Sequence, residues 1–136
     1  MENKNEIVDF LRSVPLFSEV STDSLLKLSE MIQFENFFKN ELILEKGTPG
    51  DAMYVIFKGK VKVHGGNYVF NELGEKDSFG EFALIENSVR SATVTSIDRS
   101  TTLKIQSSHF GVFIKNWIVK ELLLQKTYFI INPLIA

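Results

Sequence analysis

Two short blocks of the chain carry side chains that together suit the binding of a small anion. The first block is Phe79-Gly80-Glu81-Phe82-Ala83-Leu84, and the second, a few residues later, is Arg90-Ser91-Ala92-Thr93-Val94. We expect Gly80 to open a single helical turn, whose free backbone N–H groups favour a phosphate. The planar fork of Arg90 matches phosphate oxygens. Glu81 would repel a phosphate, so we expect it to face a hydroxyl donor such as a ribose 2′-OH.

These blocks resemble the phosphate-binding cassette of the cyclic nucleotide-binding domains. That cassette reads Phe-Gly-Glu-x-Ala-Leu, a short variable loop, and then Pro-Arg-x-Ala-Thr-Val. Here the cassette is residues 79–94, with residues 85–88 as the loop. A second block, Gly47-Thr48-Pro49-Gly50-Asp51-Ala52-Met53-Tyr54-Val55-Ile56 with the later Gly59, also resembles the family. The resemblance runs from about Phe17 to the C-terminal region. Val89 stands where many ligand-binding members have proline, which supplies rigidity and no direct contact.

The resemblance implies both the fold and the ligand-binding residues. The fold would be a mainly β domain with flanking helices, a β jelly roll (double-stranded β-helix) with an N-terminal helix and C-terminal lid helices. The ligand would be a cyclic nucleotide, with cyclic AMP preferred over cyclic GMP. The implied ligand-binding residues are Phe79, Gly80, Glu81, Phe82, Ala83, Arg90, Ser91 and Ala92. The last helix would swing over the base as a lid, with Leu124, Tyr128 or Phe129 capping it.

Composition limits what else the chain can do. Its 136 residues suit one domain with its own core, and a net charge of −2 provides no basic field for nucleic acid or anionic lipid. Without cysteine, the chain has no disulfide, zinc–thiolate site or thiol nucleophile. No segment matches a signal peptide or a membrane span, so we expect a cytoplasmic protein without membrane insertion. The two histidines, His64 and His109, form no metal motif.

The pattern of apolar residues predicts three regions. Residues 1–33 are expected to be helical, with Ser21 to Ser24 as candidate N-caps for an amphipathic helix of about three turns that includes Leu25 and Ile32. Residues 34–106 read as short strands separated by turns, typical of a jelly roll. The predicted strands are 34–39, 42–45, 53–57, 60–64, 68–73, 91–97 and 101–105. Residues 107–132 are expected to form C-terminal helices that end before Pro133.

The segment from Trp117 to Ile131 predicts a protein contact. Its apolar residues cover nearly all sides of a helix, so more than one face should be buried. A ligand, a second copy or a partner domain would cover the face that the β domain leaves open. We expect a homodimer with these helices paired.

Three alternatives stay open at this point. A degenerate member of the family would keep the fold and use the helix only for protein contacts. A transcription factor of the catabolite-activator type would need a helix-turn-helix, and only residues 133–136 follow the lid helix. A cupin-like enzyme would need a histidine metal motif that the chain lacks. No nucleophile–base pair is found in the sequence, so we expect no enzymatic activity.

Overall fold

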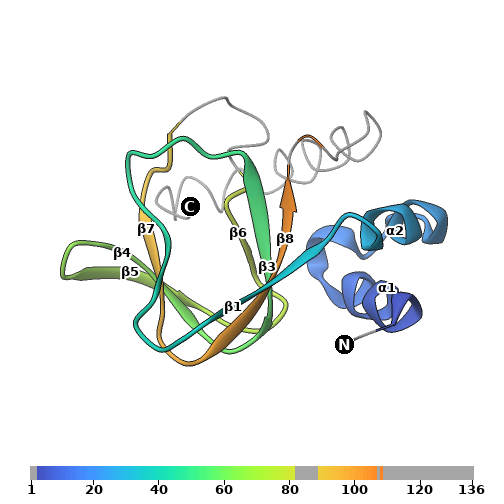
Figure 1. The fold of residues 1–136 in the computed structure, drawn as a ribbon, viewed down its shortest axis with the longest axis horizontal. Helices are drawn as coiled ribbons and strands as arrows, with labels where there is room; N and C mark the ends of the chain where they lie inside the picture. Colours follow the sequence, from blue (N-terminus) through green and yellow to red (C-terminus); the bar gives the residue numbers. More distant parts are fainter. Residues whose placement is uncertain (1–2, 82–88, 107, 109–136) are drawn as a thin grey trace.

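The computed structural model describes residues 3–81, 89–106 and 108, and they form a two-sheet β jelly roll with helices packed on one face (Figure 1). One sheet has the strand order β1-β8-β3-β6, and the other has the order β2-β7-β4-β5. All pairings within the two sheets are antiparallel. The strands are β1 (Gln33–Phe37), β2 (Leu42–Leu44), β3 (Ala52–Lys58), β4 (Val61–Gly65), β5 (Tyr68–Leu73), β6 (Ser78–Phe79), β7 (Thr93–Ser96) and β8 (Ser100–Gln106).

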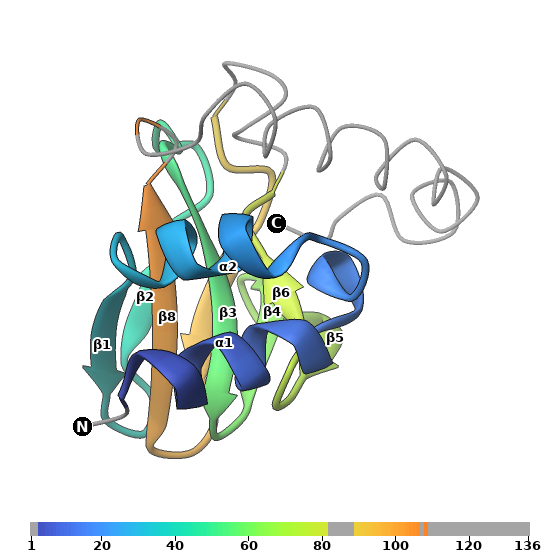
Figure 2. The same ribbon diagram turned by 90° about the vertical axis from the view of Figure 1, so that its right-hand side faces the viewer.

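Two helices and a 3-10 turn precede the strands. They are α1 (Lys4–Ser13), η1 (Pro15–Phe17) and α2 (Thr22–Ser29). A capping box starts α1, since the Asn3 side chain accepts a hydrogen bond from the Glu6 N–H and the Glu6 side chain accepts one from the Asn3 N–H. Figure 2 shows both helices lying across the face of the sheet that contains β3 and β8.

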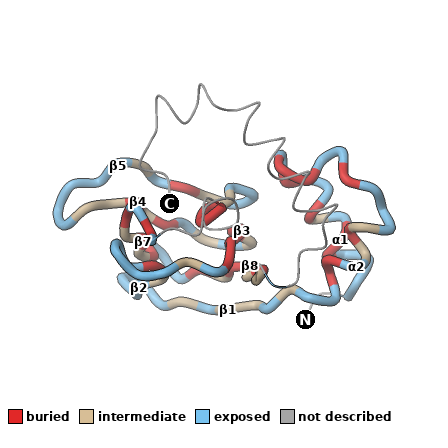
Figure 3. Tube along the Cα trace, turned by 90° about the horizontal axis from the view of Figure 1, so that it is seen from above, coloured by how far each residue is buried: buried red, intermediate tan, exposed pale blue. Residues whose placement is uncertain are grey.

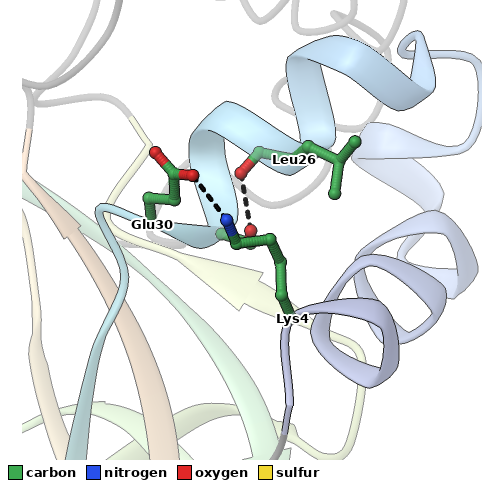
Figure 4. A network of polar contacts seen from close by, with 4 residues as sticks. Lys4, Leu26 and Glu30 are labelled. Atoms are coloured by element: carbon green, nitrogen blue, oxygen red, sulfur yellow. Dashed lines mark hydrogen bonds and ion pairs between the residues drawn. The ribbon is translucent and has the colours of Figure 1, made fainter.

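The predicted second helix is shorter than its apolar pattern suggests. Ser21 caps α2 as predicted, because its side chain accepts a hydrogen bond from the Ser24 N–H. The helix ends at Ser29, whose hydroxyl donates to the Leu26 carbonyl at 2.6 Å. An exposed ion pair between Lys4 and Glu30, at 2.5 Å, joins the start of α1 to the residue after α2 (Figure 4). Both partners are exposed, so we expect this pair to add little stability.

The strand β3 is buried on both of its faces, which explains its continuous apolar run. Met53 and Val55 pack beneath the helices, in a core that also contains Leu11, Phe17 and Leu25. Tyr54 and Ile56 point between the two sheets, into a second core with Val61, Val63, Phe79 and Val94. Figure 3 shows this central strand as buried, whereas much of β5 at the sheet edge is exposed. β3 therefore separates the two cores of the domain.

Candidate functional site

The side chain of Arg90 is buried between the start of β3 and the end of β6. Its exposed fraction is 6%, and it lies one residue after a bridge between Pro49 and Val89. Arg90 Nη1 donates to the Gly80 carbonyl at 3.0 Å, and Nη2 donates to the Ala52 carbonyl at 2.7 Å. A guanidinium has five N–H groups. The two carbonyls fix its orientation and leave donors for an anion.

Gly80 allows this close approach because it has no side chain. Its φ is +85°, in the left-handed region that favours glycine. A Cβ atom at this position would lie 3.0 Å from Arg90 Nη1 and 3.1 Å from the Ala52 carbonyl oxygen. The sequence predicted a backbone role for Gly80. The structure adds that the missing side chain makes room for Arg90.

Glu81 is the second buried charged residue of the site, with an exposed fraction of 6%. Burial raises the pKa of its carboxyl group, and a hydrogen bond with the Ser78 side chain partly opposes this rise. The positive charge of Arg90 also favours the ionised form, while Asp77 disfavours it. The carboxyl group therefore sits in a dry position, where a hydroxyl donor would stabilise its charge.

Arg90 has no carboxylate within ion-pair distance among the described residues, whose salt bridges are Lys4–Glu30 and Lys104–Glu35. Burial lowers the pKa of its guanidinium, and Tyr54, Asp51 and Glu81 oppose that effect from further away. Buried charges in proteins are normally paired. The site thus contains a buried cation that lacks a close anionic partner in this part of the chain.

The predicted site residues fall into three groups. Gly80, Glu81 and Arg90 lie together, as described above. Phe79 and Ala92 are fully buried in the core between the sheets, and Ser91 is exposed. Phe82 and Ala83 lie outside the described residues, as do the predicted loop at 85–88, the lid residues Leu124, Tyr128 and Phe129, and the predicted helices at 107–132 apart from Ser108.

Sequence reasoning missed two parts of this site. The Ala52 carbonyl orients Arg90, and a backbone acceptor leaves no trace in residue type. The segment from Gly47 to Pro49 also contacts the backbone of Arg90 and of Val89 through main-chain groups, which residue types do not reveal. His64 is structural, since its ring nitrogens lie 2.9 Å from the Gly66 carbonyl oxygen and 2.8 Å from Thr95 Oγ1.

The described residues contain neither a cluster of metal-ligating side chains nor a helix suited to a membrane. No group of three or more His, Cys, Asp or Glu side chains within residues 3–81, 89–106 and 108 could hold a metal ion. None of the helices in this part of the chain is long and apolar enough to cross a membrane.

Comparison with known proteins identifies the family. Residues 34–116 match the model of the cyclic nucleotide-binding domain, so the chain belongs to that family. It is 34% identical over 119 residues to the cGMP-dependent protein kinase isozyme 2 forms cD5/T2 of Drosophila melanogaster, covering 82% of this chain and 13% of the kinase. It is 33% identical over 111 residues to the cAMP-dependent protein kinase regulatory subunit of Dictyostelium discoideum, covering 76% of this chain and 34% of that subunit. The chain thus matches about a third or less of these relatives.

Solved structures support the same fold. The regulatory subunit of a cAMP-independent protein kinase A from Trypanosoma brucei has a TM-score of 0.82 and 24% identity. The match covers 91% of this chain and 46% of that subunit. At this identity the likeness shows the fold alone, and it confirms the predicted jelly roll.

Proposed function

We propose that this domain binds a cyclic nucleotide, with cyclic AMP preferred over cyclic GMP, and transmits binding through its C-terminal segment. Arg90 would hold the cyclic phosphate, and Glu81 would accept a hydrogen bond from the ribose 2′-OH. The observation that carries this proposal is the buried Arg90 guanidinium, which no carboxylate of the described residues neutralises. A cyclic phosphate brings one negative charge and two free oxygens to such a fork.

The proposed domain is a binding module without catalytic turnover. The relatives with which it aligns are named as cyclic nucleotide-dependent kinases and a regulatory subunit, and this chain matches only a minor part of each. Incubation of purified protein with cyclic AMP and a divalent cation is expected to leave the nucleotide intact. Sustained release of 5′-AMP would contradict this part of the proposal.

Isothermal titration tests the ligand assignment directly. The panel consists of cyclic AMP, cyclic GMP and adenosine, which lacks the phosphate. A panel of this kind is needed because the relatives' names cover both nucleotides and the Trypanosoma protein is called cAMP-independent. We expect cyclic AMP to bind most tightly and adenosine to bind much more weakly.

Substitution of Arg90 makes the test specific to the site. Removing one member of a buried charge-assisted contact costs about 2–5 kcal/mol, so Arg90→Ala should weaken cyclic AMP binding about 30-fold or more. Arg90→Lys should recover only part of the loss, because lysine lacks the fork. Arg99→Ala removes the same charge from an exposed turn and serves as the control. Equal binding by the parent and Arg90→Ala would rule out the cassette assignment.

A second candidate is a degenerate domain that keeps the fold and makes only protein contacts. Val89, in place of proline in the cassette, is the observation that favours it. A parent protein that binds no member of the ligand panel would support this candidate. The homodimer or partner-domain contact through residues 117–131 is part of both proposals. Sedimentation at micromolar concentration that shows only monomer, with and without nucleotide, would count against the dimer.

A further inference from the structure

The turn between β2 and β3 holds the backbone of Arg90. The Arg90 N–H donates to the Thr48 carbonyl at 2.8 Å, and the Gly47 N–H donates to the Arg90 carbonyl at 2.9 Å. Both backbone groups of Arg90 are therefore bonded to two consecutive residues of one turn. Gly47 and Thr48 thus lie opposite the single residue Arg90, and Gly47 has a left-handed backbone. These are the features of a β-bulge, and bulges are common beside functional sites.

The turn itself, which we call the Arg90 splint, comprises Glu45 to Pro49. Its closing bond runs from the Thr48 N–H to the Glu45 carbonyl at 3.2 Å, and the Thr48 hydroxyl donates to the same carbonyl at 2.7 Å. The Lys46 N–H donates to Thr93 Oγ1 at 3.1 Å, which ties the splint to the start of β7. The splint thus bonds to the chain at Arg90 and again at Thr93.

Gly47 occupies the third position of this turn with a φ of +88°, as a type II turn requires. A Cβ atom there would meet nothing within 4 Å. The space around Gly47 therefore tolerates a side chain, and only its backbone conformation disfavours one. A Gly47→Ala substitution perturbs the shape of the turn without creating a clash.

Val89 completes the arrangement because it forms an antiparallel bridge with Pro49. The hydrogen bond from the Arg90 N–H to the Thr48 carbonyl lies next to this bridge. Pro49 and Val89 are therefore a non-hydrogen-bonded pair of the antiparallel ladder. Within residues 3–81 and 89–106, no acceptor is bonded to the Val89 N–H. A proline at position 89 would therefore break no hydrogen bond of the described residues.

We infer that the Arg90 splint fixes the position of Arg90 and thereby sets the affinity of the site, supplying the rigidity that a proline would otherwise supply. This inference rests on the proposed function. The splint residues are positioning residues, because they act on the ligand only through Arg90. Release of the splint would leave Arg90 in several arrangements, of which the ligand binds one, and the apparent dissociation constant would rise accordingly.

The first test needs no ligand. Amide hydrogen exchange, measured by NMR on the unliganded protein, reports opening of the Arg90 N–H. Alanine in the left-handed region costs about 1–2 kcal/mol, so Gly47→Ala should speed exchange of this amide roughly tenfold. Gly66→Ala is the matched control, since Gly66 has a φ of +60°, has open space around its Cβ position and lies in the turn between β4 and β5. Equal exchange of the Arg90 amide in both variants would overturn the inference.

The second test connects the splint with affinity. By isothermal titration, Gly47→Ala should bind cyclic AMP about three- to tenfold more weakly than the parent, and Gly66→Ala should bind like the parent. Val89→Pro should restore most of the loss in the Gly47→Ala background and change little by itself. In the Arg90→Ala background, Gly47→Ala should have no further effect.

The outcomes separate the inference from the proposed function. Unchanged affinity of Gly47→Ala, or a loss that persists in the Arg90→Ala background, would overturn the inference while leaving cyclic nucleotide binding intact. A parent that fails to bind would overturn the proposed function, together with the claim that the splint sets affinity. The exchange experiment would still decide whether the splint holds Arg90.

Discussion

Tyr54 of β3 and Phe79 of β6 stack face to face, with ring centroids 5.1 Å apart and an interplanar angle of 7°. The two residues are also register partners in the sheet. The strand β6 has only two residues, and this ring pair is a side-chain contact that joins it to β3. Gly80, whose carbonyl orients Arg90, follows Phe79 directly. The stack therefore supports the site from inside the core.

Loss of the stacked ring should destabilise the domain. Tyr54→Leu removes the aromatic pair, whose energy beyond simple burial is about 0.5–1.5 kcal/mol. We expect the free energy of unfolding to fall by at least this amount, as measured by chemical denaturation. Tyr54→Phe keeps the ring and is the control. A stability of Tyr54→Leu equal to that of the control would show that the stack contributes nothing.

Gly80→Ala should damage both stability and binding. The alanine would have to keep a positive φ, and its Cβ atom would lie 3.1 Å from the Ala52 carbonyl oxygen. We expect a loss of about 1–3 kcal/mol in the free energy of unfolding and weaker cyclic AMP binding. Gly74→Ala has open space and no left-handed backbone, so it should be nearly neutral. Equal melting temperatures for the two variants would contradict this account.

The raised pKa of Glu81 predicts a pH-dependent effect on stability. Above its ordinary pKa of 4.5, the unfolded chain loses this proton more readily than the folded domain. The contribution of Glu81 to stability should therefore decrease as pH rises from 4.5 through its folded pKa. Glu81→Gln removes this dependence. The melting temperature of the variant, relative to that of the parent, should therefore increase as pH rises over this range. A constant difference across that range would count against a buried, destabilised carboxylate.

The same substitution tests the role of Glu81 in binding. If the carboxylate faces the ribose, Glu81→Gln should weaken cyclic AMP binding less than Arg90→Ala does, because glutamine keeps an acceptor oxygen. The effect should shrink for 2′-deoxy cyclic AMP, which lacks the hydroxyl. An undiminished loss with the deoxy analogue would assign Glu81 a different role.

Thr102 offers a stabilising substitution. It is fully buried in β8, and its hydroxyl is the one buried side-chain polar atom of the described residues without a hydrogen-bond partner. Thr102→Val keeps the shape and removes the unpaired hydroxyl, so we expect a gain of about 1 kcal/mol in the free energy of unfolding. Ser100→Ala is the contrast, because Ser100 Oγ accepts from the Lys60 N–H and donates to the Asp98 carbonyl. A destabilising Thr102→Val would indicate a partner for the hydroxyl.

The local pattern of apolar residues, turn residues and capping residues was enough to predict most strands and the N-cap at Ser21. It failed for β6, since a two-residue strand has no measurable alternation. It placed a helical region at residues 1–33 without locating the start of α1, which the capping box between Asn3 and Glu6 fixes. The strand predicted from Ser91 is shorter and begins at Thr93.

The cassette could be found from sequence because its residue types are specific, but the orientation of Arg90 could not. That orientation depends on the Ala52 carbonyl, 38 residues earlier, and on the Gly47 to Pro49 backbone. Main-chain oxygens are identical in every residue, so only the folded topology shows which of them an arginine meets.

The pairing of β1 with β8 also constrains how the chain can fold as it is made. The Thr101 hydroxyl donates a hydrogen bond to the Asn36 side chain, 65 residues away in sequence. Among the described residues, β1 has no strand partner other than β8. Contacts this distant are slow to form because a long loop must close first. At about 5–20 residues per second, synthesis of β8 follows that of β1 by several seconds. During that interval the backbone N–H and C=O groups of β1 lack the strand partner that β8 gives them in the folded domain.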